Sequence, residues 1–565
     1  MYKPELLASI KGYNSKKFFQ DFTAGIIVAI VALPLSIAFA IASGCSPETG
    51  LYTAIIAGYC ISAFGGTKVQ IGGPTGAFTV IIYAIVNNPN LGFAGLATAT
   101  VLAGIMLILL GAFKLGGLVK FIPYTIVVGF TAGIAVTIAT GQIGDFFGLT
   151  PQFPIVAFGS VYEKMPGTFV GKILIYANSL SSINIYSFLM ALVSLILLFV
   201  LPKFTKKIPA SLIVIALATL ANLFIDHFFN LKTTLIGDLY KIPDSLPKPM
   251  LPDFSINTIK TVFPSAISIA LLAAIESLLS AVVADGMTGS KHDSNNELIG
   301  QGIANIFSPI FGGLPATGAI ARTATNINNG GKTPIAGIVH ALTLLFIMIF
   351  FGKYVQYIPL ASLAAILIQV AWNMAGLRAI RSLLKGQKSD TAVLLVTFLI
   401  TVFIDLTYAI GIGLVFAAFL FIKKMIDLST VSLGSPSLAE GLNGEGSTQE
   451  LTLPKQVLVY EIDGPLFFGT VRKFEYATEV ADADIKVIIF RMKNTLYLDA
   501  GGIIALEQVK NACGRKDITI ILSGLHKQPY LLCKKMGIVE IIGRENIFAN
   551  IDSALKRAEE ILTSK

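Results

Sequence analysis

Long apolar runs separated by short polar loops make up most of the chain as far as residue 425. About fourteen such runs occur, and each is close to, or somewhat shorter than, the roughly 20 residues that a helix needs to cross a bilayer. The pattern predicts an α-helical polytopic membrane protein with about fourteen spans. The predicted spans are 22–43, 51–65, 74–86, 93–113, 123–143, 185–203, 209–228, 262–285, 297–311, 319–329, 334–352, 358–375, 389–405 and 408–425.

Two of the predicted spans, the third and the tenth, are too short to cross alone, and similar sequences lie around their starts. Broken segments at matching places in two halves of a chain are typical of a transporter binding site. A helix that begins at membrane depth directs unpaired backbone N–H groups, and roughly half a positive charge, at whatever lies in front of it. Two such ends facing one another form an anion site without a charged side chain. The two copies read Phe64-Gly65-Gly66 then Gly73-Pro74-Thr75-Gly76-Ala77-Phe78, and Phe311-Gly312-Gly313 then Pro315-Ala316-Thr317-Gly318-Ala319-Ile320.

Composition agrees with a membrane protein and narrows the classes of function. The 565 residues are 54% hydrophobic and 13% charged, whereas about 25% of the residues of a soluble protein are charged. The net charge of +9 is explained by basic loops between apolar runs, so we expect no nucleic-acid partner. The sequence shows no phosphate-binding loop, no nucleotide fingerprint and no cluster with metal-ligand spacing. We therefore expect a protein that is not an enzyme, needs no cofactor or metal, and draws on an ion or substrate gradient.

Basic residues predict the orientation in the membrane. Lysines and arginines follow the sixth, twelfth and fourteenth predicted spans, on the same side as the lysine-rich N-terminus. That side is expected to be the cytoplasm, which makes the chain a multi-pass protein of the cell membrane. Segments 167–181 and 374–386 read as amphipathic helices that lie at the interface between spans.

The composition changes near residue 428. We expect a transmembrane domain over 1–431, a polar linker over 432–452 and a cytoplasmic domain over 453–565. Alternating strand and helix patterns in the last segment predict an α/β unit with a mostly parallel sheet. Its predicted strands are 456–462, 485–492 and 517–523, and its predicted helices are 470–480, 501–513, 527–536 and 550–562.

Two charged residues inside apolar segments are candidates for chemistry. Glu276 is the only ionisable residue between Val262 and Ala284, and a charge at a helix centre costs about 2.5 kcal/mol or more, so it should face a cavity, a partner or a proton. The alternative is a fixed salt bridge or hydrogen bond between helices. Arg322 begins the second short helix and has three possible roles: to neutralise Glu276, to reinforce the helix dipole towards an anion, or to reach water.

Small residues near the starts of the two short helices would let a ligand approach the backbone closely. Their alternative role is tight helix packing, for which small residues are common in membranes. The aromatic Phe39 of the first span could line the site with its electropositive ring edge, or could simply pack. The small residues in question are Thr75, Gly76, Ala77, Gly318, Ala319 and Ala321.

Four stretches of the chain carry a family resemblance: Asp21-Phe22-Thr23-Ala24-Gly25 through Pro34, Pro47-Glu48-Thr49-Gly50-Leu51-Tyr52, Gly73-Pro74-Thr75-Gly76, and Ala321-Arg322-Thr323-Ala324-Thr325-Asn326 through Gly330-Gly331-Lys332-Thr333. Over nearly its whole length the chain resembles the sulfate permease (SulP) family of anion transporters and exchangers, and the terminal domain resembles the STAS domain. The resemblance implies a seven-plus-seven inverted repeat shared with uracil transporters, core and gate subdomains, and a homodimer. It also implies a substrate between spans one, three, eight and ten.

Carried onto this chain, the resemblance places the substrate at Phe39, at Thr75 to Ala77 and at Ala319 to Arg322, with ion coupling at Glu276. Similar sodium-coupled bicarbonate transporters carry an Asp and a Thr in span eight and a Thr where span ten begins. The matching positions here are Glu276, Ser280 and Ile320. This difference favours protons over sodium, although Glu276 and Ser280 still offer oxygen atoms.

The leading hypothesis is a secondary transporter of a small inorganic or carboxylate anion (sulfate, bicarbonate or dicarboxylate), in proton symport through Glu276 by alternating access. Sodium-dependent bicarbonate uptake is the alternative within transport. Nucleobase transport on the same fold is disfavoured, because such carriers are not expected to carry a STAS tail. A membrane scaffold regulated by its STAS domain is the alternative outside transport.

Overall fold

The chain is described from a computed structural model, which covers residues 2–117, 123–157, 160–204, 209–229, 231–240, 249, 251–404, 406–433, 454–471 and 484–564. It divides into two compact units, Met1–Val415 and Phe416–Lys565.

A helix stands at each of the fourteen predicted apolar runs. The first seven are α2 (Ser15–Ala42), α3 (Pro47–Phe64), η1 with α4 (Gly76–Phe78 and Thr79–Val86), α5 (Gly92–Ala112), α6 (Tyr124–Gly141), α9 (Ile185–Phe204) and α10 (Ala210–Phe229). The other seven are α12 (Ile256–Thr288), α13 (Ser294–Ile310), α14 (Ile320–Asn328), α15 (Ile335–Phe351), α16 (Leu360–Met374), α18 (Lys388–Phe403) and α19 (Leu406–Leu428).

Short elements fill the connections. They are α1 (Glu5–Ser9), α7 (Ile143–Phe147), the hairpin β2–β3 (Ile155–Ala157 and Ser160–Tyr162), α8 (Phe169–Asn178), η3 (Leu180–Ser182), α11 (Ile236–Leu239), η4 (Gly352–Tyr357) and α17 (Leu377–Leu384). Helices α8 and α17 lie inside the two segments that were expected to be interfacial. Within the described residues, nine helices are long and apolar enough to span a membrane, so the count of fourteen crossings stays a prediction.

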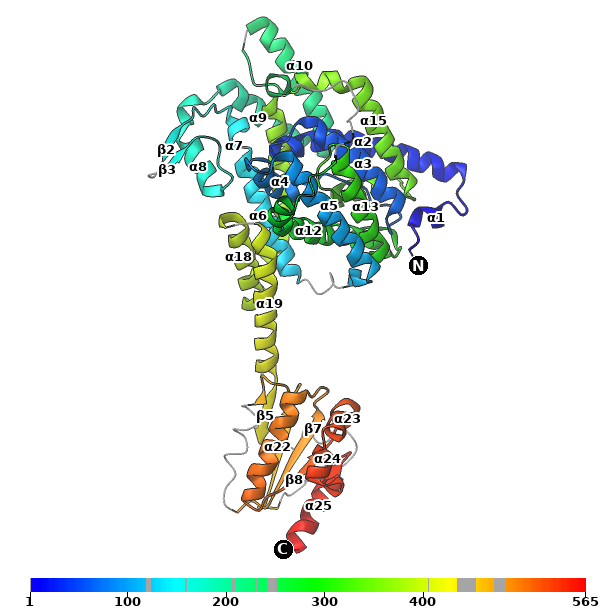
Figure 1. Cartoon of the computed structure of the whole chain (residues 1–565), viewed down its shortest axis with the longest axis vertical. Helices are drawn as coiled ribbons and strands as arrows, with labels where there is room; N and C mark the ends of the chain where they lie inside the picture. Colours follow the sequence, from blue (N-terminus) through cyan, green and yellow to red (C-terminus); the bar gives the residue numbers. More distant parts are fainter. Residues whose placement is uncertain are drawn as a thin grey trace. The chain divides into compact units, whose positions relative to one another are not determined.

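Most of the helices that carry the predicted site pack on one another in the first unit. Helix α13 lies against α3 and α5, α12 lies against α5 and α14, and α2 lies against α3 and α15; Figure 1 shows α4, α5 and α12 together in the middle of this unit. Where α5 crosses α13, a Cβ on Gly104 would lie 2.7 Å from the carbonyl oxygen of Gly302. Glycine therefore allows the two backbones to approach closely. A second group, formed by α6, α9, α16 and α18, packs along the contacts α6–α18, α9–α16 and α6–α16.

The second unit contains a five-stranded sheet in the order β5-β6-β7-β8-β9. Strands β6 to β9 pair in parallel, as the sequence predicts, and β5 adds an antiparallel edge strand. The bounds of its strands are β5 (Thr430–Leu433), β6 (Val457–Asp463), β7 (Val487–Asn494), β8 (Thr519–Ser523) and β9 (Ile547–Phe548). Its helices are α22 (Ala500–Arg515), α23 (Lys527–Lys535), α24 (Ile538–Ile542), η6 (Arg544–Asn546) and α25 (Ile551–Ser564).

Two hydrophobic clusters hold this sheet between its helices. Side chains of α22 and α24 join alternate positions of β6 to β8 in one cluster, and α25 joins the other positions in the second. One boundary differs from the prediction, because Ser432 and Leu433, expected in the linker, hydrogen-bond as part of β5. The rest of the predicted linker lies outside the described residues, as does most of the predicted helix 470–480.

Candidate functional site

The two broken segments, far apart in sequence, meet as a short antiparallel ribbon. Strand β1 (Gly72–Gly73) pairs with β4 (Thr317–Gly318), with Gly72 opposite Gly318 and Gly73 opposite Thr317. Each strand is followed within a few residues by one of the two short helices. No side chain caps the start of either helix. Their first backbone N–H groups are therefore not satisfied by a capping side chain.

Glu276 lies beside the start of the first short helix. It comes from α12, is partly buried, and accepts a hydrogen bond from Thr75 Oγ1 at 2.9 Å. Ser280 lies one turn further along α12 and donates to Thr323 Oγ1 at 3.2 Å. That same oxygen accepts the backbone N–H of Ile71 at 3.1 Å. The two α12 side chains thus contact the two broken segments, one each.

The structure disfavours two of the three roles suggested for Arg322, the reach to water and the ion pair with Glu276. Arg322 is 1% exposed, so it does not reach water. Among the described ion pairs there is none between Arg322 and Glu276. Instead, Nη2 donates to the carbonyl oxygen of Pro74 at 2.9 Å and, at 3.5 Å, to Ser36 Oγ. Its other terminal nitrogen, Nη1, is buried without a hydrogen-bond partner among the described residues. The remaining possibility, that Arg322 reinforces the attraction of an anion, stays open.

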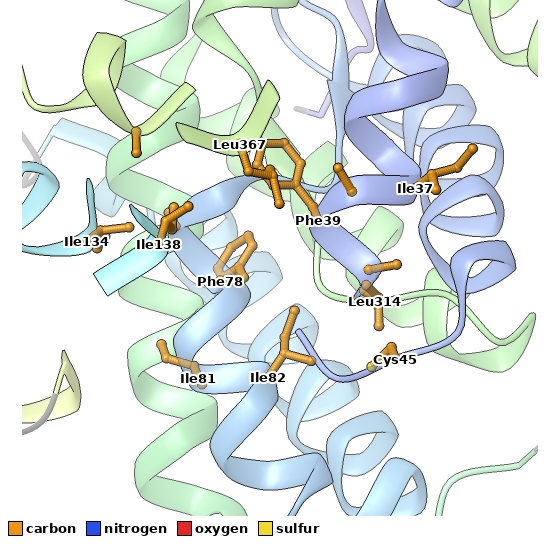
Figure 2. Packing of buried hydrophobic residues seen from close by; sticks show 14 of the residues in the cluster. Ile37, Phe39, Cys45, Phe78, Ile81, Ile82, Ile134, Ile138, Leu314 and Leu367 are labelled. Carbon is orange, nitrogen blue, oxygen red and sulfur yellow. The ribbon is translucent and has the colours of Figure 1, made fainter. Parts of the chain in front are cut away.

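Side chains close the space in front of the first short helix. A Cβ placed on Gly76 would lie 2.8 Å from Ile138 Cδ1, 3.1 Å from Phe39 Cε1 and 3.3 Å from Met374 Sδ. Figure 2 shows Phe39, Phe78, Ile138 and Leu367 gathered there, from α2, η1, α6 and α16. Phe39 therefore lies close to the start of the first short helix, and its contact with a substrate stays a prediction. Glycine at position 76 is the only residue that fits without movement of its neighbours.

The start of the second short helix is more open. Ala319 is partly buried and donates its N–H to the carbonyl of Ile71 at 2.9 Å, whereas Ile320 is 44% exposed and Ala321 is also exposed. Gly318 is buried against the side chain of Gln70. Of the predicted small residues, Gly318 therefore serves packing, and Ala319 and Ala321 line an accessible edge.

Sequence reasoning missed a second buried acid. Glu297 of α13 is 0% exposed and accepts four hydrogen bonds. Its donors are the N–H of Gly66 (3.0 Å), Thr67 Oγ1 (2.8 Å), Ser277 Oγ (3.1 Å) and Gln301 Nε2 (2.8 Å).

A signal for this cluster was present in the sequence. Glu297, Gln301 and Asn305 recur every four residues and form one polar face on an apolar helix. Asn305 uses that face to hold the second broken segment, since its amide oxygen accepts the N–H of Ala316 at 2.9 Å. Among the described residues, no group of three His, Cys, Asp or Glu side chains could hold a metal ion.

Comparison with known proteins assigns the family. The chain matches the sulfate permease family over residues 18–397 and the STAS domain over residues 449–554. It belongs to the sulfate permease family.

Relatives of this family member cover almost its whole length. It is 41% identical over 546 residues to "Putative sulfate transporter YvdB" of Bacillus subtilis (strain 168), which covers 96% of this chain and 98% of that protein. It is 29% identical over 550 residues to the bicarbonate transporter BicA of Picosynechococcus sp. (strain ATCC 27264 / PCC 7002 / PR-6), covering 95% and 94%. The solved structure of the murine Slc26a9 anion transporter in the inward-facing state matches with a TM-score of 0.84 at 20% identity, covering 99% and 94%.

These comparisons confirm a helical membrane-transport fold with a C-terminal STAS domain. The relatives carry the names of transporters, which agrees with the prediction that this family member is not an enzyme. The roles of the candidate site residues stay predictions.

Proposed function

We propose that this sulfate permease family protein is a secondary active transporter of a small anion of the sulfate, bicarbonate or dicarboxylate class. It works by alternating access and is coupled to protons through Glu276. The observation that carries the proposal is the ribbon β1–β4, from which two short helices begin without side-chain caps. The names of the relatives, sulfate and bicarbonate transporters, support the substrate class.

The site has the chemistry of an anion site. Uncapped helix starts offer N–H donors and a partial positive charge. Arg322 adds a buried guanidinium whose Nη1 has no protein partner among the described residues. Its backbone contact at Pro74 places the cation close to the residues that precede the first helix start. An oxyanion or carboxylate matches such donors better than a cation does.

Glu276 and Glu297 are not equivalent, and the difference supports Glu276 as the proton carrier. Glu297 is surrounded by four donors and acts as a fixed acceptor that joins helices. Glu276 accepts a hydrogen bond from the hydroxyl of Thr75 and is partly exposed. A hydroxyl can reverse its role and accept a hydrogen bond from a protonated carboxyl. Glu276 can therefore gain or lose a proton without leaving a partner unsatisfied.

Sodium-driven bicarbonate uptake is the second candidate, favoured by the relatedness to a bicarbonate transporter. A sodium ion at Glu276 would need further oxygen ligands, of which Ser280 is the nearest on the same face of α12. The Ser280 hydroxyl already donates to Thr323. We further propose a homodimer in the cell membrane, with the N-terminus and the STAS domain in the cytoplasm, where that domain regulates transport. A STAS-regulated scaffold is the alternative outside transport.

Uptake into proteoliposomes tests the proposal. Labelled sulfate, bicarbonate and succinate are each supplied with no gradient, with an inward proton gradient and with an inward sodium gradient. We expect saturable uptake of at least one anion, accelerated by protons. Acceleration by sodium alone would replace the proton proposal with the sodium one. Absence of saturable uptake for every anion would favour the scaffold.

A further inference from the structure

A buried lysine without a counter-charge among the described residues lies beside a small cavity. The cavity has a volume of about 20 Å³, which is room for about one water molecule. It is lined by α2, α4, α6 and α8 together with Gly167. The Lys172 side chain comes from α8 and is 9% exposed. Its Nζ lies 4.7 Å from the centre of the Tyr83 ring. A Cβ placed on Gly141 would lie 3.7 Å from the same Nζ. Both residues line the cavity, so the ammonium group is at its wall.

Lys172 has no acidic partner among the described residues. The ion pairs of the described residues involve other side chains, and the Lys172 Nζ donates no hydrogen bond to any of those residues. Burial of an unpaired ammonium group is costly, and the tyrosine ring offsets only about 0.5–2 kcal/mol of that cost. A residue kept in such a position points to a ligand that supplies the missing negative charge.

The other lining groups fit an anion and do not fit a cation. No acid lines the cavity. The hydroxyl groups of Thr79 and Thr137 already donate to the carbonyls of Gly76 and Gly133. The groups left to meet a ligand are the Lys172 ammonium and the amide of Gln142, which is 6% exposed. An ammonium and an amide N–H are donors suited to a sulfate or carboxylate oxygen.

The cavity adjoins the candidate site through one side chain. Ile138 lines the cavity, and the same side chain would lie 2.8 Å from a Cβ on Gly76. Thr79, also in the lining, is bonded to the Gly76 carbonyl. The cavity and the start of the first short helix are therefore neighbours, with Ile138 touching both.

We infer that this cavity is a separate anion site on the outer side, where Lys172 and Gln142 hold an incoming oxyanion before Ile138 moves aside. The inference rests on the proposed anion transport and on the proposed orientation, which puts segment 167–181 outside. At its present volume the cavity is too small for sulfate, so the site is completed when the outer side opens. If Lys172 serves only to hold α8 against the Tyr83 ring, no anion is involved.

Kinetics of sulfate uptake from outside intact cells test the charge. Lys172→Gln removes it and Lys172→Arg keeps it. Lys353→Gln is the matched control, because the exposed Lys353 also lies over a tyrosine ring, 5.3 Å from the centre of Tyr354. We expect Lys172→Gln to raise KM for external sulfate roughly three- to ten-fold with little change in maximal rate. Lys172→Arg and Lys353→Gln should stay near the parent value. An unchanged KM in an active Lys172→Gln variant, or an equal shift in Lys353→Gln, overturns the inference.

A second measurement does not depend on transport. Gly141→Cys places a thiol next to Lys172. The rate at which this thiol reacts is then measured with two external methanethiosulfonates, one carrying a sulfonate group and one carrying a trimethylammonium group. Unaltered protein gives the background from the four native cysteines, which are buried. We expect the Gly141→Cys thiol to react faster with the sulfonate reagent than with the trimethylammonium reagent, and external inorganic sulfate to slow the sulfonate reaction. Both the difference between the reagents and the slowing by sulfate should disappear when Lys172→Gln is added. Equal rates for the two reagents overturn the site even if the protein transports. If the sulfonate reagent still reacts faster in a protein that shows no uptake, the transport proposal is refuted and the anion site is kept.

Discussion

The guanidinium of Arg322 donates a hydrogen bond to the carbonyl oxygen of Pro74, 2.9 Å away. A side chain from the second broken segment thus holds the backbone that leads into the first. The strands that precede the two short helices are paired with each other as well. The candidate site is therefore one unit built from both copies of the motif, and disturbance of either copy should reach the other.

Substitution of Arg322 separates its charge from its geometry. Arg322→Lys keeps a cation but loses the planar group that reaches Pro74 and Ser36. A hydrogen bond to a charged group contributes about 1.5–3 kcal/mol. We therefore expect sulfate affinity to fall roughly ten-fold or more in Arg322→Lys, and further in Arg322→Met. Binding to detergent-purified protein measures both. Wild-type affinity in Arg322→Met would remove this residue from the site.

Glu276→Gln tests proton coupling. The amide keeps the size of the side chain and an oxygen that can accept from Thr75, but it has no proton to carry. We expect uptake driven by a pH gradient to fall to the level seen without a gradient, while sulfate still binds. The exposed Glu163, changed to Gln, is the control for loss of one carboxyl group. Proton-driven accumulation that is undiminished in Glu276→Gln would refute the carrier role.

Gly76→Leu fills the space at the start of the first short helix. The larger side chain must displace Ile138 and Met374, and overpacking of this kind costs about 1–3 kcal/mol. Gly286→Leu is the control, since nothing lies within 4 Å of a Cβ at that position of α12. We expect folded Gly76→Leu protein to bind sulfate weakly and the control to bind normally. Normal binding in both would show that the anion does not approach this helix start.

Glu297→Gln tests the buried acid that joins α13 to its neighbours. One oxygen acceptor becomes an NH₂ group, which faces donors and leaves at least one of them unsatisfied. An unsatisfied buried polar group costs about 1–3 kcal/mol. Thermal unfolding in detergent should therefore occur at a lower temperature in Glu297→Gln than in the Glu163→Gln control. If Glu297→Gln keeps its stability but loses pH-driven uptake, Glu297 is a proton carrier and the assignment to Glu276 fails.

Removal of the STAS domain tests the division of labour between the two domains. A chain that ends at Leu428 is preferable to one that ends within the predicted linker, because β5 starts at Thr430 and pairs with β6. All candidate site residues lie between Phe39 and Arg322. We expect the shortened protein to bind sulfate with unchanged affinity and to transport it more slowly. Loss of binding in a stable, inserted protein would show that the STAS domain helps to form the site.

Periodicity predicted the elements well because each depends on local sequence. Helices stand at all fourteen apolar runs, and strands β6, β7 and β8 at the three predicted strand segments. The short strands β5 and β9 were missed. Each is stabilised by a neighbouring strand, and at four and two residues they carry too little pattern to be seen alone.

Contacts between distant segments were predicted only in part. The paired motif correctly pointed to two short helices, but their connection through β1 and β4 depends on residues about 245 positions apart, whose pairing no local pattern encodes. The pairing of Glu276 with Arg322 was a plausible match of opposite charges. In the structure the two residues form no ion pair, and each has a different hydrogen-bond partner, Thr75 for the acid and the Pro74 carbonyl for the base. Sequence alone does not show which hydrogen-bonding groups the fold brings next to a buried charge.

The ribbon of β1 and β4 also has a consequence for inheritance. Gly72 faces Gly318, and Gly73 faces Thr317, so each copy of the motif is the structural environment of the other. A Cβ on Gly72 would meet Ile61, and one on Gly318 would meet Gln70. A side chain in place of Gly318 would therefore require a compensating change at Gln70, in the other half of the chain, whereas one in place of Gly72 would require a change at Ile61, in its own half. Inheritance of the second motif is thus tied at Gly318 to the sequence of the first.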